Sequence, residues 1–136
     1  MGIIEAITNE DRRIVKRYII LPMIITAFER DSRYIQEQLK TPGPYVDVIK
    51  GAIDLAHKDL MEVKKHFWLK GIKVYDEQTT RIGRRAKFMC RGYTSQIELR
   101  WEYISAEASV MMRKYLGLDI SRFADTSLPE HLREKY

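Results

Sequence analysis

Residues 72–92 read IKVYDEQTTRIGRRAKFMCRG, and their hydropathy alternates with a period of two, unlike the segments on either side. Ala86, Phe88 and Cys90 alternate with larger, mostly basic side chains, which is typical of a half-buried strand. The preceding arm, which begins at Ile72, alternates in the same way. The stretch therefore predicts a β-hairpin with one apolar face and one basic face.

The parity of the two arms predicts the turn between them. Both arms place their apolar side chains at even positions, and facing residues of antiparallel strands share one side of a sheet. The loop must then contain an odd number of residues, and residues 81–83, Arg-Ile-Gly, supply three, with a glycine for positive φ. This register sets Val74 opposite Cys90.

The hairpin carries the charge of the chain. Residues 70–91 contain seven Lys or Arg and two acids, a balance of +5, which equals the formal net charge of all 136 residues. Basic side chains at a protruding tip can bind the phosphates of DNA or RNA, although a solvated basic strand also protects a sheet edge from aggregation. The candidate nucleic-acid-binding residues are Arg81, Arg84, Arg85, Lys87 and Arg91.

Two long segments before the hairpin have helical periodicity. Residues 9–40 carry one apolar stripe at spacings of three and four, and Thr8 with Asp11 forms a capping arrangement at their start. Pro22 lies inside this segment and predicts a kink, because proline removes a helical hydrogen bond. Residues 44–70 repeat the three-and-four spacing and predict a second helix.

A third helix is predicted over residues 94–117, with Ser95 and Glu98 as a capping box. It is apolar on two sides, and a helix of this kind needs cover on both of them. With only three long helices available, the second apolar face predicts a partner chain, and a homodimer is the simplest form. The residues of this face are Leu99, Tyr103, Ala106 and Val110.

The predicted fold class is therefore mainly α, a single domain in which three long helices form a bundle and one β-hairpin is inserted between the second and third helices. The chain length suits one domain with its own hydrophobic core. The tail after the third helix carries a capping pattern that predicts a short helix over residues 128–135.

Several functional classes find no support in the sequence. The glycines form no nucleotide-binding motif, and Glu62 with His66 is better explained as an exposed helical pair than as a metal site, so we expect no enzyme, cofactor or metal. The lone Cys90 suits a reducing compartment, which favours the cytoplasm. The longest nearly apolar run, residues 19–28, is too short to cross a membrane.

Three segments of the chain resemble a known group of proteins. They are RYIILPMIITAFERD (residues 17–31), PGPYVDVIKGAI (residues 42–53) and RGYTSQIELR (residues 91–100). They are similar to the short, uncharacterised, YhjD-like proteins of bacilli and their phages. This resemblance implies a bacterial or phage protein of helix, helix, hairpin, helix order, and it transfers no catalytic residue.

Two functions remain open at this point. One is a small non-enzymatic regulatory protein that binds nucleic acid through the basic hairpin. The other is an adaptor or inhibitor that binds another protein through the second apolar face of the third helix. The two functions differ in the salt dependence they predict for binding.

Overall fold

The protein is an α+β domain in which a helical hairpin packs on a small sheet. A computed structural model describes residues 6–124, 127–129 and 136. Within these residues the three strands form one antiparallel sheet of order β1-β2-β3. The elements are α1 (Asn9–Gln38), α2 (Gly43–Lys70), β1 (Ile72–Thr79), β2 (Gly83–Cys90), β3 (Tyr93–Arg100), α3 (Trp101–Tyr115) and the short 3-10 helix η1 (Ser121–Phe123).

The predicted fold class, a helical bundle with one hairpin, is wrong because a third strand follows the hairpin. β3 takes the first part of the predicted helix over residues 94–117, which leaves α3 15 residues long. Only Arg91 and Gly92 join β2 to β3, and their φ values are 50° and 90°. A two-residue hairpin loop of type I′ requires positive φ at both positions. Ser95 therefore caps no helix, and its hydroxyl accepts a hydrogen bond from Arg12 Nη2 at 3.2 Å.

The sequence of β3 is compatible with two periodicities. Ile97 and Leu99 are buried whereas Gln96 and Glu98 are exposed, which is the alternation of a strand with one covered face. Ile97 also lies four residues before Trp101, which fits a helical stripe. The tight turn before β3 decides between the two, since it brings this segment alongside β2.

The register of the predicted hairpin is also corrected. Ile72 pairs with Cys90 and Val74 with Phe88, so the predicted pairing of Val74 with Cys90 is displaced by two residues. The parity argument holds for this half of the hairpin, because the even residues of both strands face the same side.

A β-bulge explains the displaced register. The pairing shifts between Tyr75 and Gln78, where Asp76 adopts a φ of 51°. A bulge inserts one extra residue into one strand and exchanges the faces of the residues that follow. The loop then consists of residues 80–82, and Gly83 is the first residue of β2 rather than the third residue of the loop.

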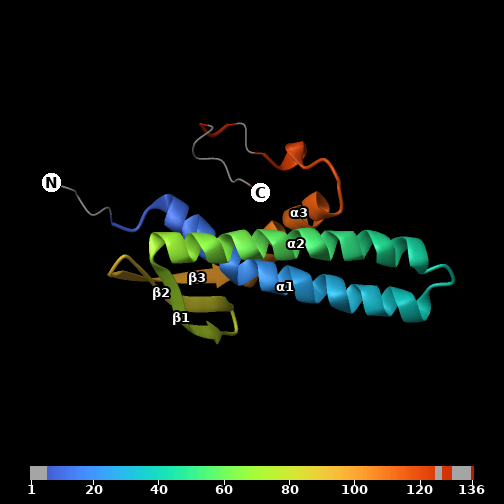
Figure 1. Ribbon diagram of the computed structural model, residues 1–136, viewed down its shortest axis with the longest axis horizontal. Helices are drawn as coiled ribbons and strands as arrows, with labels where there is room; N and C mark the ends of the chain where they lie inside the picture. Colours follow the sequence, from blue (N-terminus) through green and yellow to red (C-terminus); the bar gives the residue numbers. More distant parts are fainter. Residues whose placement is uncertain (1–5, 125–126, 130–135) are drawn as a thin grey trace.

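α1 is the central element of the core. It packs against α2 along its length and also contacts α3 and the inner face of the sheet (Figure 1). Figure 1 also shows the sheet at one end of the helical hairpin and the α1–α2 loop at the other end. The buried apolar residues of α1 are Ile14, Val15, Ile19, Ile20, Leu21, Ile24, Ile25 and Phe28.

The ends of the first two helices agree with the sequence. The Thr8 hydroxyl accepts from the Asp11 N–H at 3.1 Å, and the Asp11 carboxylate accepts from the Thr8 N–H at 2.9 Å, so the capping box is formed. α1 continues as one helix through Pro22, and a kink there stays a prediction. α2 ends at Gly71, whose φ is 62°.

The predicted second apolar face of the third helix is wrong. Leu99 belongs to β3 and is buried in the core, and Val110 is buried as well. Ala106 is exposed, and Tyr103 is half-buried, with Lys16 Nζ 5.1 Å from its ring centroid. These residues form no continuous surface, so they give no support to a homodimer.

Two further predictions concern the tail and the membrane. Most of the predicted helix over residues 128–135 lies outside the described residues, because these do not include residues 130–135. None of the helices within the described residues has both the length and the hydropathy needed to cross a bilayer.

Gly83 offers a test of the sheet. It pairs with Arg100, and a Cβ atom at Gly83 would lie 1.9 Å from the carbonyl oxygen of Leu99. We expect Gly83→Ala to lower the free energy of unfolding by about 1–3 kcal/mol in urea titrations, because a backbone neighbour cannot yield to the added methyl group.

Gly51 in α2 supplies the matched control. A Cβ atom there meets no atom within 4 Å, so Gly51→Ala should raise the free energy of unfolding by about 0.5–1 kcal/mol through helix propensity. Equal stability of the Gly83→Ala variant and the wild type would contradict the close contact between β2 and β3.

Candidate nucleic-acid interface

The sheet has one covered face and one open face. Ala86 and Phe88 of β2 are buried beneath the helices, so the alternating Arg85 and Lys87 lie on the opposite side and are exposed. Figure 1 shows helices on only one side of the sheet. We call the open side the outer sheet face. Strand pairing assigns to it Lys73, Tyr75, Gln78, Arg85, Lys87, Met89, Thr94, Gln96, Glu98 and Arg100.

A shallow polar hollow of about 250 Å³ lies on the outer sheet face. Arg85 Nη2 donates to Gln78 Oε1 at 2.9 Å, and Lys87 Nζ lies 3.4 Å from Asp76 Oδ2. Gln96 of β3 completes the lining. Exposed ion pairs of this kind contribute about 0–1 kcal/mol, so a phosphate can replace the carboxylate at little cost.

Arg84, a predicted contact residue, faces the other way. It lies on the inner side of β2, where its Nη2 is 3.5 Å from Glu77 Oε1. Alternation along the regular strand β2 turns Arg84 to the same side as Ala86 and Phe88. The bulge in β1 turns Glu77 inward beside Arg84, while Asp76 stays with Lys87 on the outer sheet face. Arg84 therefore does not join Arg85 in one patch.

Arg91 holds three elements together. Its Nη2 donates to Asp11 Oδ2 at 2.7 Å and its Nη1 donates to the Lys70 carbonyl at 3.1 Å. Its own backbone N–H donates to the Gly71 carbonyl at 2.9 Å. The start of α1, the end of α2 and the β2–β3 turn thus meet at this side chain, which gives Arg91 a structural role.

Asp11 is only 2% exposed and is the one buried charged residue of the described chain. Burial acts to raise the pKa of its carboxyl group, but the hydrogen bonds from Arg91 and Thr8 outweigh burial and hold the pKa below its usual value. The carboxylate is therefore ionised and paired at neutral pH.

Arg81 is exposed on an anchored loop. Its backbone carbonyl accepts from the indole Nε1–H of Trp101 at 3.1 Å, and the Ile82 carbonyl accepts from the Trp101 backbone N–H at 3.0 Å. Both bonds fix the β1–β2 loop to the first residue of α3. The Arg81 side chain consequently projects from a defined position at the end of the sheet.

The sequence analysis missed five charged or amide residues of this face, Lys73, Gln78, Gln96, Glu98 and Arg100. The alternation of the first arm already indicated that Lys73 faces away from its apolar side chains. Gln78 could not be placed on this face from the alternation, because the bulge exchanges the faces of the residues that follow it. Gln96 and Arg100 were assigned to a helix. Of the five predicted residues, the structure brings Arg85 and Lys87 together, places Arg81 at the end of the sheet, and turns Arg84 and Arg91 elsewhere.

Other reactive groups are weak candidates for chemistry. No group of three His, Cys, Asp or Glu side chains suited to a metal ion occurs among residues 6–124, 127–129 and 136, and Glu62 and His66 are exposed on α2. Cys90 is fully buried, and burial, followed by the charge of Asp11, raises the pKa of its thiol. A buried, protonated thiol is a packing residue.

These features define a small α+β protein with cationic and amide side chains on an open sheet face. The YhjD protein family matches residues 6–120. Uncharacterized protein YhjD of Bacillus subtilis (strain 168) is 31% identical over 104 residues, which cover 76% of this chain and 87% of that protein. The chain therefore belongs to the YhjD family, which confirms the resemblance seen in the sequence. No solved structure matches the chain.

The ion pair between Asp11 and Arg91 can be tested by mutation and pH. We expect Asp11→Asn to lower the free energy of unfolding by about 1–3 kcal/mol at pH 7, because the buried carboxylate loses its charge-assisted hydrogen bond with the partly exposed Arg91. Since the folded-state pKa is depressed, this stabilisation is present above the usual pKa of 3.8 and is lost as the pH falls through the lower folded-state value.

Urea titrations across the acid range should therefore show the wild type and Asp11→Asn converging in stability as the pH falls below 3.8. Asp31→Asn is the control, because Asp31 forms an exposed pair with Arg30 and should cost about 0.5 kcal/mol or less. A difference between wild type and Asp11→Asn that persists unchanged at low pH would contradict the assigned role of the carboxylate.

Proposed function

We propose that the protein is a small, non-enzymatic regulatory protein of the cytoplasm that binds nucleic acid through the outer sheet face. The observation that carries the proposal is the hollow in which Arg85 and Lys87 lie beside the amides of Gln78 and Gln96. Guanidinium and ammonium groups bind phosphates, and amide groups also contact base edges.

The charge of this face favours an anionic partner. The outer sheet face and the adjoining β1–β2 loop carry five basic and two acidic side chains, an excess of three positive charges. Three phosphate contacts predict a slope of about −3 for log affinity against log salt on duplex DNA. The side chains concerned are Lys73, Arg81, Arg85, Lys87 and Arg100 against Asp76 and Glu98.

The shape of the face also suits a nucleic acid. Antiparallel strands present side chains in rows on a twisted surface, and a two-stranded ribbon fits the major groove of DNA. β2 and β3 are paired without interruption from Gly83 with Arg100 to Cys90 with Tyr93, and β1 extends this surface along the other edge of β2. Arg84 and Arg91 are not needed for this binding, because both are committed to ion pairs within the chain.

Charge reversal on the outer sheet face tests this function. We expect Arg85→Glu with Lys87→Glu to weaken binding of fluorescent DNA and RNA oligonucleotides at least about tenfold at low salt, because two phosphate contacts become repulsive. Fluorescence anisotropy over a salt series gives both the affinity and the salt slope. Comparison of duplex and single-stranded probes then shows which nucleic acid is preferred.

Arg33→Glu with Lys40→Glu is the matched control. It changes the net charge equally, but both residues are exposed near the α1–α2 loop, at the opposite end of the molecule from the sheet (Figure 1). Equal weakening by the two double variants would mean that only net charge matters, and an absence of binding by the wild type would remove the proposal.

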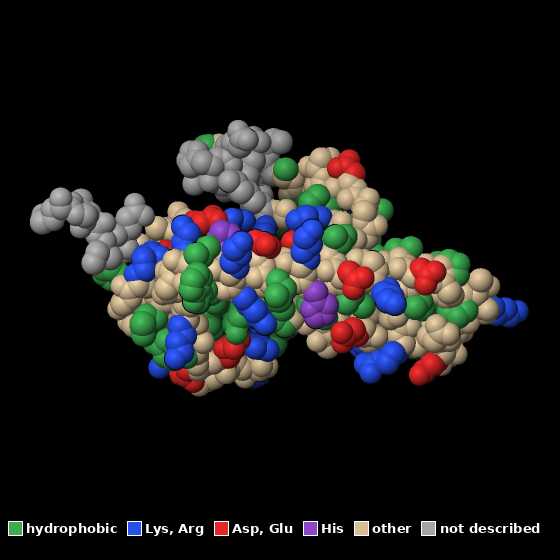
Figure 2. Space-filling model, in the orientation of Figure 1, with side chains coloured by type: hydrophobic (Ala, Val, Ile, Leu, Met, Phe, Trp, Pro, Cys, Tyr) green, Lys and Arg blue, Asp and Glu red, His purple; other side chains and the backbone are tan. Residues whose placement is uncertain are grey.

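A second candidate function, binding of a protein partner, is favoured by α2. Trp68 is 82% exposed and Met61 is 67% exposed, and their spacing of seven residues places them on one face of the helix. Figure 2 shows hydrophobic side chains beside basic ones where α2 passes over the sheet. Exposed large apolar side chains of this kind mark interaction sites. In this second candidate function, the surface that binds a protein partner lies on α2 and not on α3. The simplest such partner is a second copy of the chain.

Sedimentation velocity tests this second candidate. We expect the wild type to dimerise with increasing concentration and Trp68→Ser to remain monomeric, because the substitution removes a central aromatic contact. Val48→Ser is the control, since Val48 is exposed on the same helix near its other end. A wild type that stays monomeric at every concentration would contradict self-association through α2 and leave the nucleic-acid proposal unaffected.

A further inference from the structure

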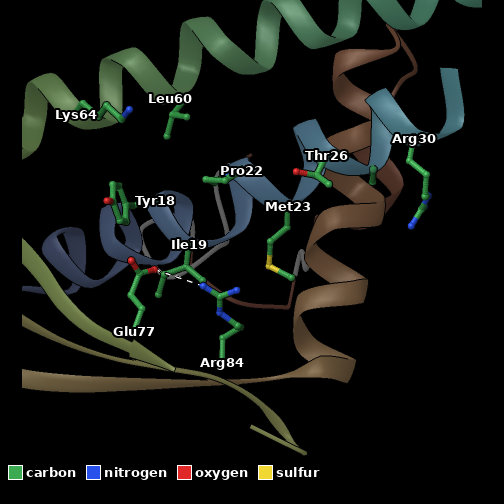
Figure 3. Close-up of a pocket in the computed structure, with 11 residues that line it drawn as sticks. Tyr18, Ile19, Pro22, Met23, Thr26, Arg30, Leu60, Lys64, Glu77 and Arg84 are labelled. Atoms are coloured by element: carbon green, nitrogen blue, oxygen red, sulfur yellow. Dashed lines mark ion pairs between the residues drawn. The ribbon is translucent and has the colours of Figure 1, made fainter. Parts of the chain in front are cut away.

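A larger hollow lies on the inner side of the β1–β2 hairpin, between α1, α2 and the strands. Its volume is about 520 Å³, within the range of roughly 300–1,000 Å³ that small-molecule sites occupy. Figure 3 shows α2 on one side of it, the hairpin strands on the other, and α1 between them. We call it the α1 groove.

The floor of the α1 groove is apolar. Ile19, Met23 and Ala27 lie four residues apart and share one face of α1, and Pro22 lies three residues after Ile19 on the same side. Leu60 of α2 joins them. This face is partly open: Met23 and Ala27 are half-buried and Pro22 is exposed. These side chains are not completely covered by any other element. A small apolar group bound here would therefore bury their apolar surface, and its own, away from water.

Pro22 gives the floor a polar feature. Proline has no N–H, so the Tyr18 carbonyl, four residues earlier, lacks its usual helical donor. Tyr18 and Pro22 both line the α1 groove. An interior proline costs a helix about 3 kcal/mol relative to alanine, and Pro22 stands at a hollow that α2 and the hairpin also line.

The rim of the α1 groove is basic. Lys64 of α2 and Arg84 of β2 stand on opposite sides of the floor, and Arg30 lies toward its far end (Figure 3). Glu77 is the single acid of the lining and pairs with Arg84 at 3.5 Å. Lys64 makes no ion pair with any of the described residues. The lining therefore has an excess of two positive charges.

We propose that the α1 groove binds a small amphipathic anion, namely a carboxylate that carries an apolar chain. The carboxylate pairs with Lys64, the rim cation that forms no ion pair with a described residue, and the chain lies along Pro22, Met23 and Ala27. A nucleic acid does not suit this site, because its floor is apolar and its cations are few. The inference stands apart from the proposed function, since the groove and the outer sheet face lie on opposite sides of the hairpin.

Decanoate is a suitable probe, and Met23 is a built-in reporter. In protein labelled with ¹³C in the methionine methyl groups, we expect decanoate to shift the Met23 methyl resonance saturably, with a Kd below about 1 mM. Met61 and Met89 are exposed outside the groove and should not shift. Met23→Leu assigns the signal by removing it.

Three comparisons sharpen the test. Lys64→Gln should weaken decanoate binding at least about fivefold by removing the unpaired cation, whereas Lys65→Gln, an exposed neighbour outside the groove, should not. Ala27→Trp should abolish binding by filling the floor, with circular dichroism to show that the variant is folded. Decyltrimethylammonium, which has the same chain and the opposite charge, should bind at least about fivefold more weakly than decanoate.

Several results would overturn the proposal. These are an unshifted Met23 resonance, equal shifts of Met23 and Met61, equal binding of the cationic and anionic probes, or undiminished binding by Lys64→Gln. Because Lys64→Gln alters an exposed side chain, its result does not depend on whether Ala27→Trp folds.

Discussion

The pairing of Asp11 with Arg91 is the interaction on which the arrangement of the fold depends. The two residues are 80 positions apart, and their side chains meet at 2.7 Å where α1 begins, α2 ends and β2 turns into β3. Asp11 also closes the capping box of α1, so one carboxylate serves the helix and the sheet together. A buried charge of this kind is tolerated only with its partners in place, so separating the three elements would leave the Asp11 carboxylate buried and unpaired.

The open and covered faces of the sheet follow from this junction. With the β2–β3 turn held against α1 and α2, the even residues of β2 lie under the helices and the odd residues face solvent. The bulge in β1 then separates two neighbouring acids, Asp76 on the outer sheet face and Glu77 toward the α1 groove. Each acid pairs with a cation of β2, so the hairpin has a distinct charged environment on each side.

The sequence predicted the local features and missed those that depend on distant contacts. The capping box of Thr8 and the end of α2 at Gly71 follow from a few neighbouring residues, and both are confirmed. β3 was missed because Ile97 fits a helix and a strand equally well, and the tight turn at Arg91 and Gly92 decides by bringing Ile97 opposite Ala86. The extra residue at Asp76 leaves no mark in the hydropathy, because both bulge residues are acidic and exposed.

The charge of the hairpin illustrates the same limit. A count of charges along residues 70–91 treats every basic side chain as equally available to a binding partner. In the folded chain, the basic side chains differ in whether a neighbouring acid pairs with them. Arg91 is neutralised by a buried carboxylate, and Arg84 by an acid on the inner side. Lys87 has only an exposed partner, and Arg85 donates to an uncharged amide, so these two retain most of their field toward solvent. The electrostatic surface is therefore set by the strand register, since a shift of one residue would exchange the paired and the available cations.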